Sequence, residues 1–297
     1  MSALDELQHA AQTVAARLGA ATVAIGRDGR GSGLVIADGR VLTCAHNLRD
    51  RTTQVTFADG RAAQATVLGA DIEGDLAVLD VDTAGAPAIE WAPSPPTDGQ
   101  VVFGAARGRA FRVTFGLVSA TERTFRGPRG RRIAGSVEHT APLARGSTGG
   151  ALADAEGRVL GVNTLRLGDR FALAQPATDA LRARVDRLAA GETPTRRRLG
   201  VALAPAHVAR RLRASVGLPE RDGLLVRGVE DGSPAAAAGI EAGDLLVSAA
   251  GRDLHSADDL FEVLEASADA ATLTIATVRG AEDRTAEVRF DTETPAA

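Results

Sequence analysis

The segment Gly146-Ser-Thr-Gly-Gly150 sets two hydroxyl residues inside a glycine-rich turn, near the middle of a chain of 297 residues. In such a turn the backbone N–H groups can converge on one point and stabilise negative charge that develops on an oxygen atom. A hydroxyl group held beside that point becomes reactive only when a base can take its proton. The rest of the chain must therefore supply that base.

Two segments upstream carry a candidate base and a candidate acid. Val41-Leu-Thr-Cys-Ala-His46 places a histidine just after a buried strand, where a neutral imidazole can act as a general base. Gly74-Asp-Leu-Ala-Val-Leu79 places Asp75 at the start of an apolar strand, where its carboxylate can hold the imidazole in one tautomer. The chain thus presents a histidine, an aspartate and a hydroxyl, in that order.

The residues around these segments are typical of short β-strands. Between Thr22 and Asn163, stretches rich in Val, Leu, Ile and Thr alternate with Gly and Asp-Gly turns about every ten residues. Apolar residues at helical spacing precede them at 4–18, and a second helical run follows at 177–190. Short strands at this spacing predict an antiparallel barrel or sandwich, so we expect a mainly β fold with the residue order of the chymotrypsin class.

The length suits two ordinary domains of roughly 100 to 200 residues each. The stretch Gly191-Glu-Thr-Pro-Thr-Arg-Arg-Arg198 combines a helix stop, a proline and a run of charge, as domain boundaries often do. We therefore expect an N-terminal helix over residues 1–19, a first β domain over 20–190, a linker over 191–198 and a second domain over 199–292.

Composition excludes several classes of protein. With 44% hydrophobic and 24% charged residues, the chain is typical of a globular protein rather than a disordered or fibrous one. The net charge of −4 gives no broad basic surface, so nucleic acid is not expected as a partner. The single cysteine, Cys44, cannot form an internal disulfide.

Sequence also bears on the compartment. No apolar run approaches the roughly 18 residues that cross a bilayer, so no membrane span is expected. The first residues lack the basic and apolar regions of a signal peptide. We expect a cytoplasmic protein, or a periplasmic or extracellular one if a leader has been removed.

Further segments, in matching order, resemble the HtrA (Deg) family of trypsin-like serine proteases with a C-terminal PDZ domain. They are Gly29-Arg-Gly-Ser-Gly-Leu-Val-Ile36, Phe115-Gly-Leu-Val-Ser119 and Gly157-Arg-Val-Leu-Gly-Val-Asn-Thr164. The resemblance implies a trypsin-like double β-barrel over 20–190, followed by a PDZ domain, a β-sheet with two helices, over 199–292.

The resemblance also implies roles for individual residues. It makes His46 the general base, Asp75 the orienting acid and Thr148 the nucleophile. The N–H groups of Gly146 and Thr148 would form the oxyanion hole, the pair of donors that stabilises the reacting oxygen.

Two residues of this turn depart from the family pattern, because Gly-Asn-Ser-Gly-Gly reads Gly-Ser-Thr-Gly-Gly here, and Thr148 stands in the position of the serine. The extra methyl of Thr148 stiffens χ1 and needs space near the imidazole or the incoming carbonyl. Two interpretations stay open. The chain is either a serine-type endopeptidase that acts in proteolysis and protein quality control, or a silent pseudoprotease that binds peptides as a chaperone, scaffold or regulator.

The sequence of the second domain predicts peptide binding rather than catalysis. Asp231-Gly-Ser-Pro-Ala-Ala-Ala-Ala-Gly-Ile-Glu-Ala-Gly-Asp244 resembles a PDZ motif, and the carboxylate-binding loop falls on Leu199, Gly200 and Val201. The other wall of the peptide groove would be lined by Leu260, Val263 and Leu264, for which an ordinary core role stays open. Ser256, with Asp259 three residues on, can cap the helix that carries them.

No cofactor is predicted, because glycines 29, 31 and 33 do not open a helix after a strand. No metal site is predicted either, since histidines 9, 139, 207 and 255 have no Cys or Asp partner at ligand spacing. The partners we expect are unfolded or C-terminal segments of other proteins. A homo-oligomer is also possible, although family trimers use aromatic residues near the N-terminus and the first aromatic here is Phe57.

Overall fold

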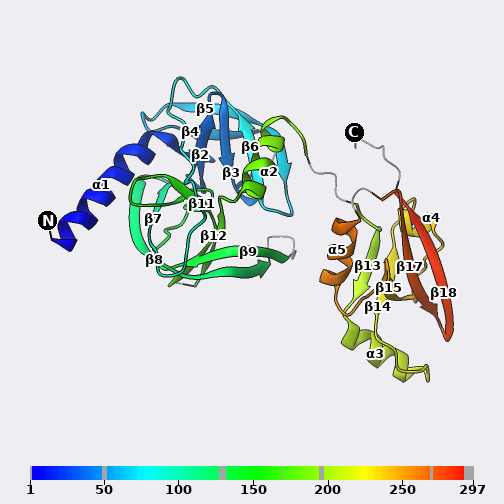
Figure 1. Ribbon diagram of the computed structural model, residues 1–297. Helices are drawn as coiled ribbons and strands as arrows, with labels where there is room; N and C mark the ends of the chain where they lie inside the picture. The colour runs from blue at the N-terminus through cyan, green and yellow to red at the C-terminus, as the bar shows by residue number, and fades with distance from the viewer. Residues whose placement is uncertain are drawn as a thin grey trace. The chain divides into compact units, whose positions relative to one another are not determined.

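Two closed barrels of six antiparallel strands form the first of two units, Met1–Pro194 and Thr195–Ala297 (Figure 1). The computed structural model describes residues 2–48, 52–126, 132–168, 170–193, 197–267 and 270–290. The middle of the predicted linker, residues 194–196, lies outside the described residues, as do the last two residues of the predicted second domain.

The first barrel has the strand order β1-β2-β3-β6-β5-β4. Its strands are β1 (Thr22–Ile25), β2 (Gly31–Ala37), β3 (Arg40–Thr43), β4 (Thr52–Thr56), β5 (Ala62–Asp71) and β6 (Leu76–Asp80), and a 3-10 turn, η1 (Ala45–Asn47), follows β3. Inward-facing side chains of alternate residues fill the barrel, among them Ile25, Val41 and Leu79.

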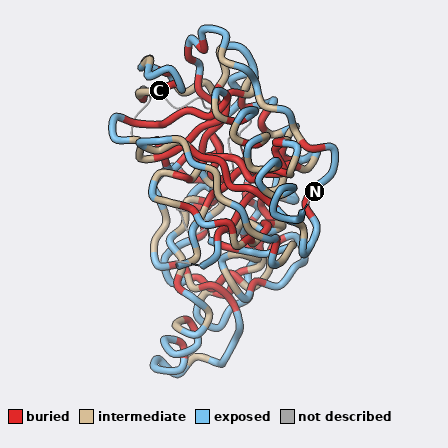
Figure 2. The backbone as a smooth tube through the Cα atoms, turned by 90° about the vertical axis from the view of Figure 1, so that its left-hand side faces the viewer, coloured by how far each residue is buried: buried red, intermediate tan, exposed pale blue. Residues whose placement is uncertain are grey.

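The second barrel has the order β10-β11-β12-β9-β8-β7. Its strands are β7 (Val101–Arg107), β8 (Phe111–Arg126), β9 (Arg132–His139), β10 (Ala151–Ala153), β11 (Val159–Leu167) and β12 (Phe171–Pro176). A further apolar cluster contains residues of both barrels, such as Leu42, Phe103 and Val162, which are fully buried. The barrels therefore share a seam of core, and Figure 2 shows buried backbone running through the inside of the molecule.

Two helices cover this unit, α1 (Ala3–Ala21) and α2 (Asp179–Ala189). A capping box between Ser2 and Asp5 opens α1, whose residues Val14 and Leu18 are buried against the barrels. The side chain of Arg107 on β7 donates to the carbonyls of Gly19 (2.6 Å) and Thr22 (2.7 Å). These bonds satisfy carbonyl groups that a helix end leaves without partners, so they fix α1 to the second barrel.

The second unit is a sheet with the order β13-β14-β15-β17-β18, and β16 pairs with β15. Its elements are β13 (Val201–Ala204), α3 (Ala206–Ser215), β14 (Leu224–Val229), α4 (Pro234–Ala237), β15 (Leu245–Ala249), β16 (Arg252–Asp253), α5 (Ala257–Ala266), β17 (Thr272–Arg279) and β18 (Glu282–Arg289). The mainly β fold, a trypsin-like unit followed by a PDZ-like sheet with helices, is as predicted.

The helices of this unit partly differ from the prediction. Ser256 caps α5 as expected: the Asp259 N–H donates to Ser256 Oγ (3.3 Å), and the Ser256 N–H donates to Asp259 Oδ2 (2.7 Å). Besides the two expected helices, α4 and α5, the structure contains α3. Pro205 precedes α3, and the side chain of Arg213 folds back to donate to the carbonyls of Pro219 and Gly280.

Candidate active site

The candidate base and acid stand on neighbouring strands of the first barrel. β3 pairs with β6. His46 lies in η1, just after β3, and Asp75 lies directly before Leu76, the first residue of β6. Asp75 has a φ of 56°, which costs a non-glycine residue backbone strain, and such strain concentrates at functional sites. Gly74 makes the approach possible, since a Cβ there would lie 2.2 Å from Asp71 Oδ2.

The carboxylate of Asp75 is buried and receives several hydrogen bonds. His46 Nδ1 lies 2.8 Å from Oδ2 and 2.9 Å from Oδ1, and the His46 N–H donates to Oδ1 at 3.0 Å. The hydroxyl of Thr164 donates to Oδ2 at 2.8 Å. A carboxylate can only accept, so the proton of the neutral imidazole lies on Nδ1 and leaves Nε2 with a free lone pair.

The hydroxyl of Thr148 lies on the other side of the imidazole. Its Oγ1 is 3.1 Å from His46 Nε2. The structure thus brings together the three residues that the sequence singled out, with a third of the imidazole exposed to solvent and Asp75 beneath it. A base, an acid and a hydroxyl in one line can move a proton from the hydroxyl to the imidazole.

The turn around Thr148 depends on two glycines. Gly146 has a φ of 79°, and a Cβ there would lie 2.2 Å from the Gly29 carbonyl oxygen; Gly149 has a φ of 87°, and a Cβ there would lie 2.1 Å from the Ser32 carbonyl oxygen. Within the described part of the chain, the N–H groups of Gly146 and Thr148 donate to no protein acceptor. The predicted oxyanion hole requires N–H groups that have no such partner.

Ser32 on β2 ties this turn to the first barrel. Its N–H donates to the carbonyl of Thr148 (2.8 Å), and its hydroxyl donates to the carbonyl of Gly146 (2.7 Å). The same hydroxyl accepts the N–H of Arg107 (2.9 Å), the residue that holds α1. One buried serine thus fixes both residues of the predicted oxyanion hole.

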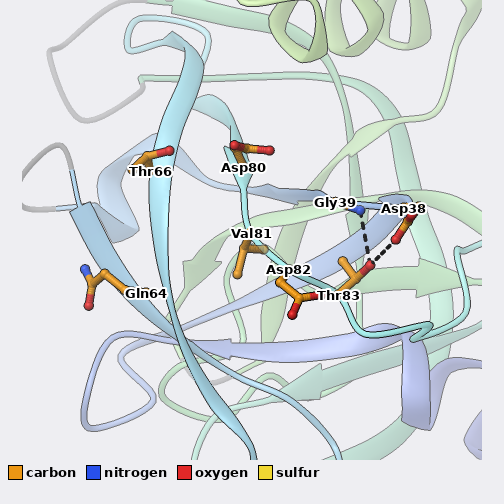
Figure 3. Close-up of a pocket in the computed structure, with 8 residues that line it drawn as sticks. All are labelled: Asp38, Gly39, Gln64, Thr66, Asp80, Val81, Asp82 and Thr83. Atoms are coloured by element: carbon orange, nitrogen blue, oxygen red, sulfur yellow. Dashed lines mark hydrogen bonds between the residues drawn. The ribbon is translucent and has the colours of Figure 1, made fainter.

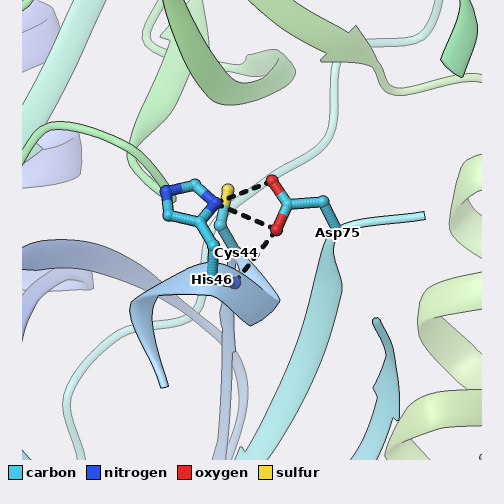
Figure 4. A group of neighbouring side chains, drawn as sticks. All are labelled: Cys44, His46 and Asp75. Atoms are coloured by element: carbon cyan, nitrogen blue, oxygen red, sulfur yellow. Dashed lines mark hydrogen bonds and ion pairs between the residues drawn. The ribbon is translucent and has the colours of Figure 1, made fainter. Parts of the chain in front are cut away.

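Cys44 lies beside the imidazole and the carboxylate, as Figure 4 shows. One ligand atom each from Cys44, His46 and Asp75 lie within 4.8 Å of one another, and the three residue types suit zinc. Burial and then the charge of Asp75 raise the pKa of the Cys44 thiol well above its ordinary value, and the thiol donates to the carbonyl of Asn163. His46 and Asp75 also already bond to each other, so the cluster fits an acid-base pair better than a metal centre.

A buried histidine, His139, supports the site from below. His139 Nε2 lies 2.9 Å from Asn163 Oδ1, and burial lowers the pKa of His139 to about 4. Asn163 in turn accepts the Gly149 N–H (2.7 Å) and the Cys44 thiol (3.4 Å) on its carbonyl. His139 therefore stands, as a neutral ring, behind the strand that holds the turn.

A hollow in the first barrel lies away from these residues. A pocket of about 430 Å³ is lined by three acidic residues, Asp38, Asp80 and Asp82, together with Thr66, Thr83 and others (Figure 3). The hydroxyl of Thr83 donates to Asp38, and Asp80 pairs with Arg40. None of the predicted site residues lines this pocket.

In the second unit the predicted binding residues lie in one apolar cluster. Leu199 packs with Leu260, Val263 and Leu264, all at least nine-tenths buried, so these side chains form core. Gly200 has a φ of 75°, and a Cβ there would lie 2.2 Å from Ser233 Cβ. Among the described strands β13, which begins at Val201, pairs only with β14, so its other edge is open.

Sequence reasoning missed the residues that support the first site. Thr164 and Asn163 lie in a segment quoted for the resemblance, which implies no role for them. Asn47 follows the histidine directly, and Ser32 lies in another quoted segment. Their roles depend on contacts with residues up to 119 positions away along the chain, which spacing alone cannot reveal.

Comparison with protein families gives two matches. Residues 31–162 match the model of a trypsin-like peptidase domain, and residues 225–277 match that of a PDZ domain. A putative serine protease HhoB from Synechocystis sp. is 33% identical over 276 residues, which is 88% of this chain and 66% of the relative. A probable periplasmic serine endoprotease, DegP-like, from Brucella suis is 32% identical, over 78% of this chain and 46% of the relative. The chain thus spans about half to two thirds of the length of these two relatives.

Solved structures agree on the fold. The HtrA-type protease AlgW with a decapeptide superimposes with a TM-score of 0.72 at 22% identity, covering 96% of this chain and 99% of that one. AlgW with a tripeptide gives a TM-score of 0.65 at 26% identity, covering 96% and 98%. In the described residues, none of the helices combines the length and apolarity of a membrane span.

Proposed function

Because the chain belongs to the HtrA family of trypsin-like peptidases with a PDZ domain, we propose that it binds polypeptide segments and cleaves them through Thr148. The single observation that carries the proposal is the hydrogen-bonded line from Asp75 through His46 to Thr148, with distances of 2.8 and 3.1 Å. Every group needed to activate a hydroxyl lies in this line. The substrate class, polypeptide, follows from the family and its PDZ domain.

The proposed reaction is acyl transfer in two stages. Thr148 Oγ1 attacks the scissile carbonyl carbon while His46 Nε2 takes its proton, and Asp75 stabilises the imidazolium that forms. The N–H groups of Gly146 and Thr148 bind the oxyanion. The C–N bond then breaks as His46 gives the proton to the leaving amine, and water, activated by His46, hydrolyses the ester to release the acid.

The proposed role of the second unit is to hold one end of a polypeptide. The open edge of β13 can accept an extended peptide as a further strand, and the loop at Leu199 and Gly200 can receive its terminal carboxylate. The AlgW structures, which carry a decapeptide and a tripeptide, are consistent with peptide binding in this family.

A second candidate function is that of a silent peptide-binding protein. The specific observation in its favour is that the Thr148 hydroxyl donates to Asn47 Oδ1 at 3.1 Å, and so need not donate to His46. The methyl of Thr148 also restricts the rotamers from which it could attack. In this case the chain would hold polypeptides without cleaving them.

Casein hydrolysis by the full chain separates the two candidates. We expect slow cleavage that Thr148→Ala and His46→Ala each lower by at least about a thousandfold, or to the background of the assay. Thermal unfolding of each variant controls for loss of structure. If the unchanged chain and Thr148→Ala give equal rates while both are folded, the chain is a silent member of the family.

A further inference from the structure

A single hydroxyl proton faces two acceptors at the centre of the site. Thr148 Oγ1 lies 3.1 Å from His46 Nε2 and 3.1 Å from Asn47 Oδ1. Since the imidazole proton lies on Nδ1, Nε2 has no proton of its own in the neutral ring. The hydroxyl can donate to only one of the two, and the general-base reaction requires that it donate to Nε2.

The surrounding hydrogen bonds fix which way the Asn47 amide points. Its Nδ2 donates to the carbonyl of Thr148 (2.9 Å) and to Thr43 Oγ1 (3.1 Å). Thr43 gives its own hydroxyl proton to the Ser32 carbonyl (2.7 Å), so toward Asn47 it can only accept. Rotating the amide by half a turn would set Oδ1 against the Thr148 carbonyl oxygen and cost both bonds.

Asn47 is also buried, with 1% of its surface exposed. A buried amide oxygen needs a hydrogen-bond donor, because an unpaired polar group in the interior costs free energy. The Thr148 hydroxyl is the donor that the structure gives it. If the Thr148 hydroxyl donated to His46 instead, Asn47 Oδ1 would lose this hydrogen bond.

We propose that Asn47 is a positioning residue that holds the Thr148 hydroxyl proton away from His46, and so limits how readily this site reacts. The kinetic part of this inference rests on the proposed function, whereas the hydrogen-bonding part does not. Asn47 touches both the hydroxyl and the carbonyl of Thr148, so it controls the side chain and the backbone of the same residue.

Asn47→Leu is the variant that tests this, because leucine keeps the branched shape and loses the amide. The Thr148 carbonyl keeps the N–H of Ser32, and the Thr43 hydroxyl keeps the Ser32 carbonyl, so the change leaves neither without a partner. Thr43→Val is the matched control. It removes the Thr43 hydroxyl, which accepts from Asn47 Nδ2, and keeps the hydrogen bond from the Thr148 hydroxyl to Asn47 Oδ1. Asn47→Ala is the second variant if Asn47→Leu does not fold.

The first readout is the ¹⁵N signal of His46 Nε2 in the full chain, at a pH of about 9 where an ordinary imidazole is neutral. Asn47→Leu should move this signal upfield, since Nε2 then accepts the Thr148 proton, and Thr43→Val should not. Adding Thr148→Val to Asn47→Leu should reverse the shift, because no hydroxyl is left to donate. No shift in Asn47→Leu, or a shift that persists with Thr148→Val, would overturn the inference.

The second readout is the rate of labelling by a fluorophosphonate probe, compared in the Thr148→Ser chain with and without Asn47→Leu. We expect labelling to rise about three- to tenfold, the factor that one neutral hydrogen bond is worth. A fall in a folded variant contradicts the kinetic part. If none of these variants is labelled, the proposed function fails, and the ¹⁵N signal still decides where the proton lies.

Discussion

The barrel site and the open edge of the PDZ sheet differ in which atoms do the recognising. In the barrel, the proposed reaction needs the side-chain atoms of His46, Asp75 and Thr148 in one line, and we expect one added methyl group to change its rate. At β13, backbone N–H and C=O groups would bind the ligand, and these are present whatever the side chains are. One substitution can therefore silence the first site, whereas the second tolerates change as long as its loop and strand keep their shape.

The largest expected effect breaks the barrel site at its acid. Adding Asp75→Asn to the Thr148→Ser chain should lower the kcat for casein by about 10³- to 10⁴-fold, since the amide favours the wrong imidazole tautomer. Asp80→Asn, at the exposed far end of β6, is the matched control and should change kcat less than about twofold. A loss below about tenfold would mean that Asp75 does not orient the base.

The next largest effect concerns peptide binding at the open edge of β13. Peptides that end in Val, Leu or Ala should bind the full chain with a Kd in the micromolar range, about −8 kcal/mol at 1 μM. Amidating the same peptides should weaken binding by about ten- to 150-fold, or roughly 1.5 to 3 kcal/mol, because a hydrogen-bonded charge is lost. Calorimetric titration with each acid and amide pair measures this. Equal binding would indicate an internal segment as the ligand.

Much of both regions could be predicted from the sequence, and the limit has a physical cause. The order of His46, Asp75 and the Gly146 turn indicated the fold and the residues that the structure brings together. The partners of these residues could not be predicted, because Ser32 and Asn47 reach Thr148 only through the register of the two barrels. In the PDZ unit, α3 could not be expected from the resemblance, which implies two helices, although the alanine, arginine and leucine residues of 206–215 favour a helix.

A smaller effect is expected from removing the methyl group of Thr148 in the barrel site. Thr148→Ser should raise casein hydrolysis at least about tenfold, because it removes one methyl and frees the rotamer while the oxyanion turn stays as it is. Thr140→Ser deletes the same methyl eight residues upstream and keeps the hydroxyl that accepts the Leu117 N–H. This control should leave the rate unchanged. Equal activity in Thr148→Ser and the unchanged chain, with both folded, would show that the methyl is not limiting.

The smallest effect concerns the buried histidine behind the turn. The pKa of His139 is about 4 in the folded chain and about 6.5 when unfolded, so its contribution is complete above pH 6.5 and is lost as pH falls toward 4. Between pH 7.5 and 5.5 the free energy of unfolding should fall by about 1.4 kcal/mol more than in His139→Gln. Urea unfolding of both proteins at the two pH values measures the difference. Parallel losses would show that His139 is not held neutral.

Covalent labelling of the full chain by a fluorophosphonate, located by peptide mass mapping, tests the central claim most directly. The account predicts one adduct, on the residue at position 148 of the Thr148→Ser variant, and none when His46→Ala is added, because the hydroxyl then has no base. An adduct on Ser147 instead, or labelling that survives His46→Ala, would contradict the assignment of Asp75, His46 and the residue at 148 as one reacting unit.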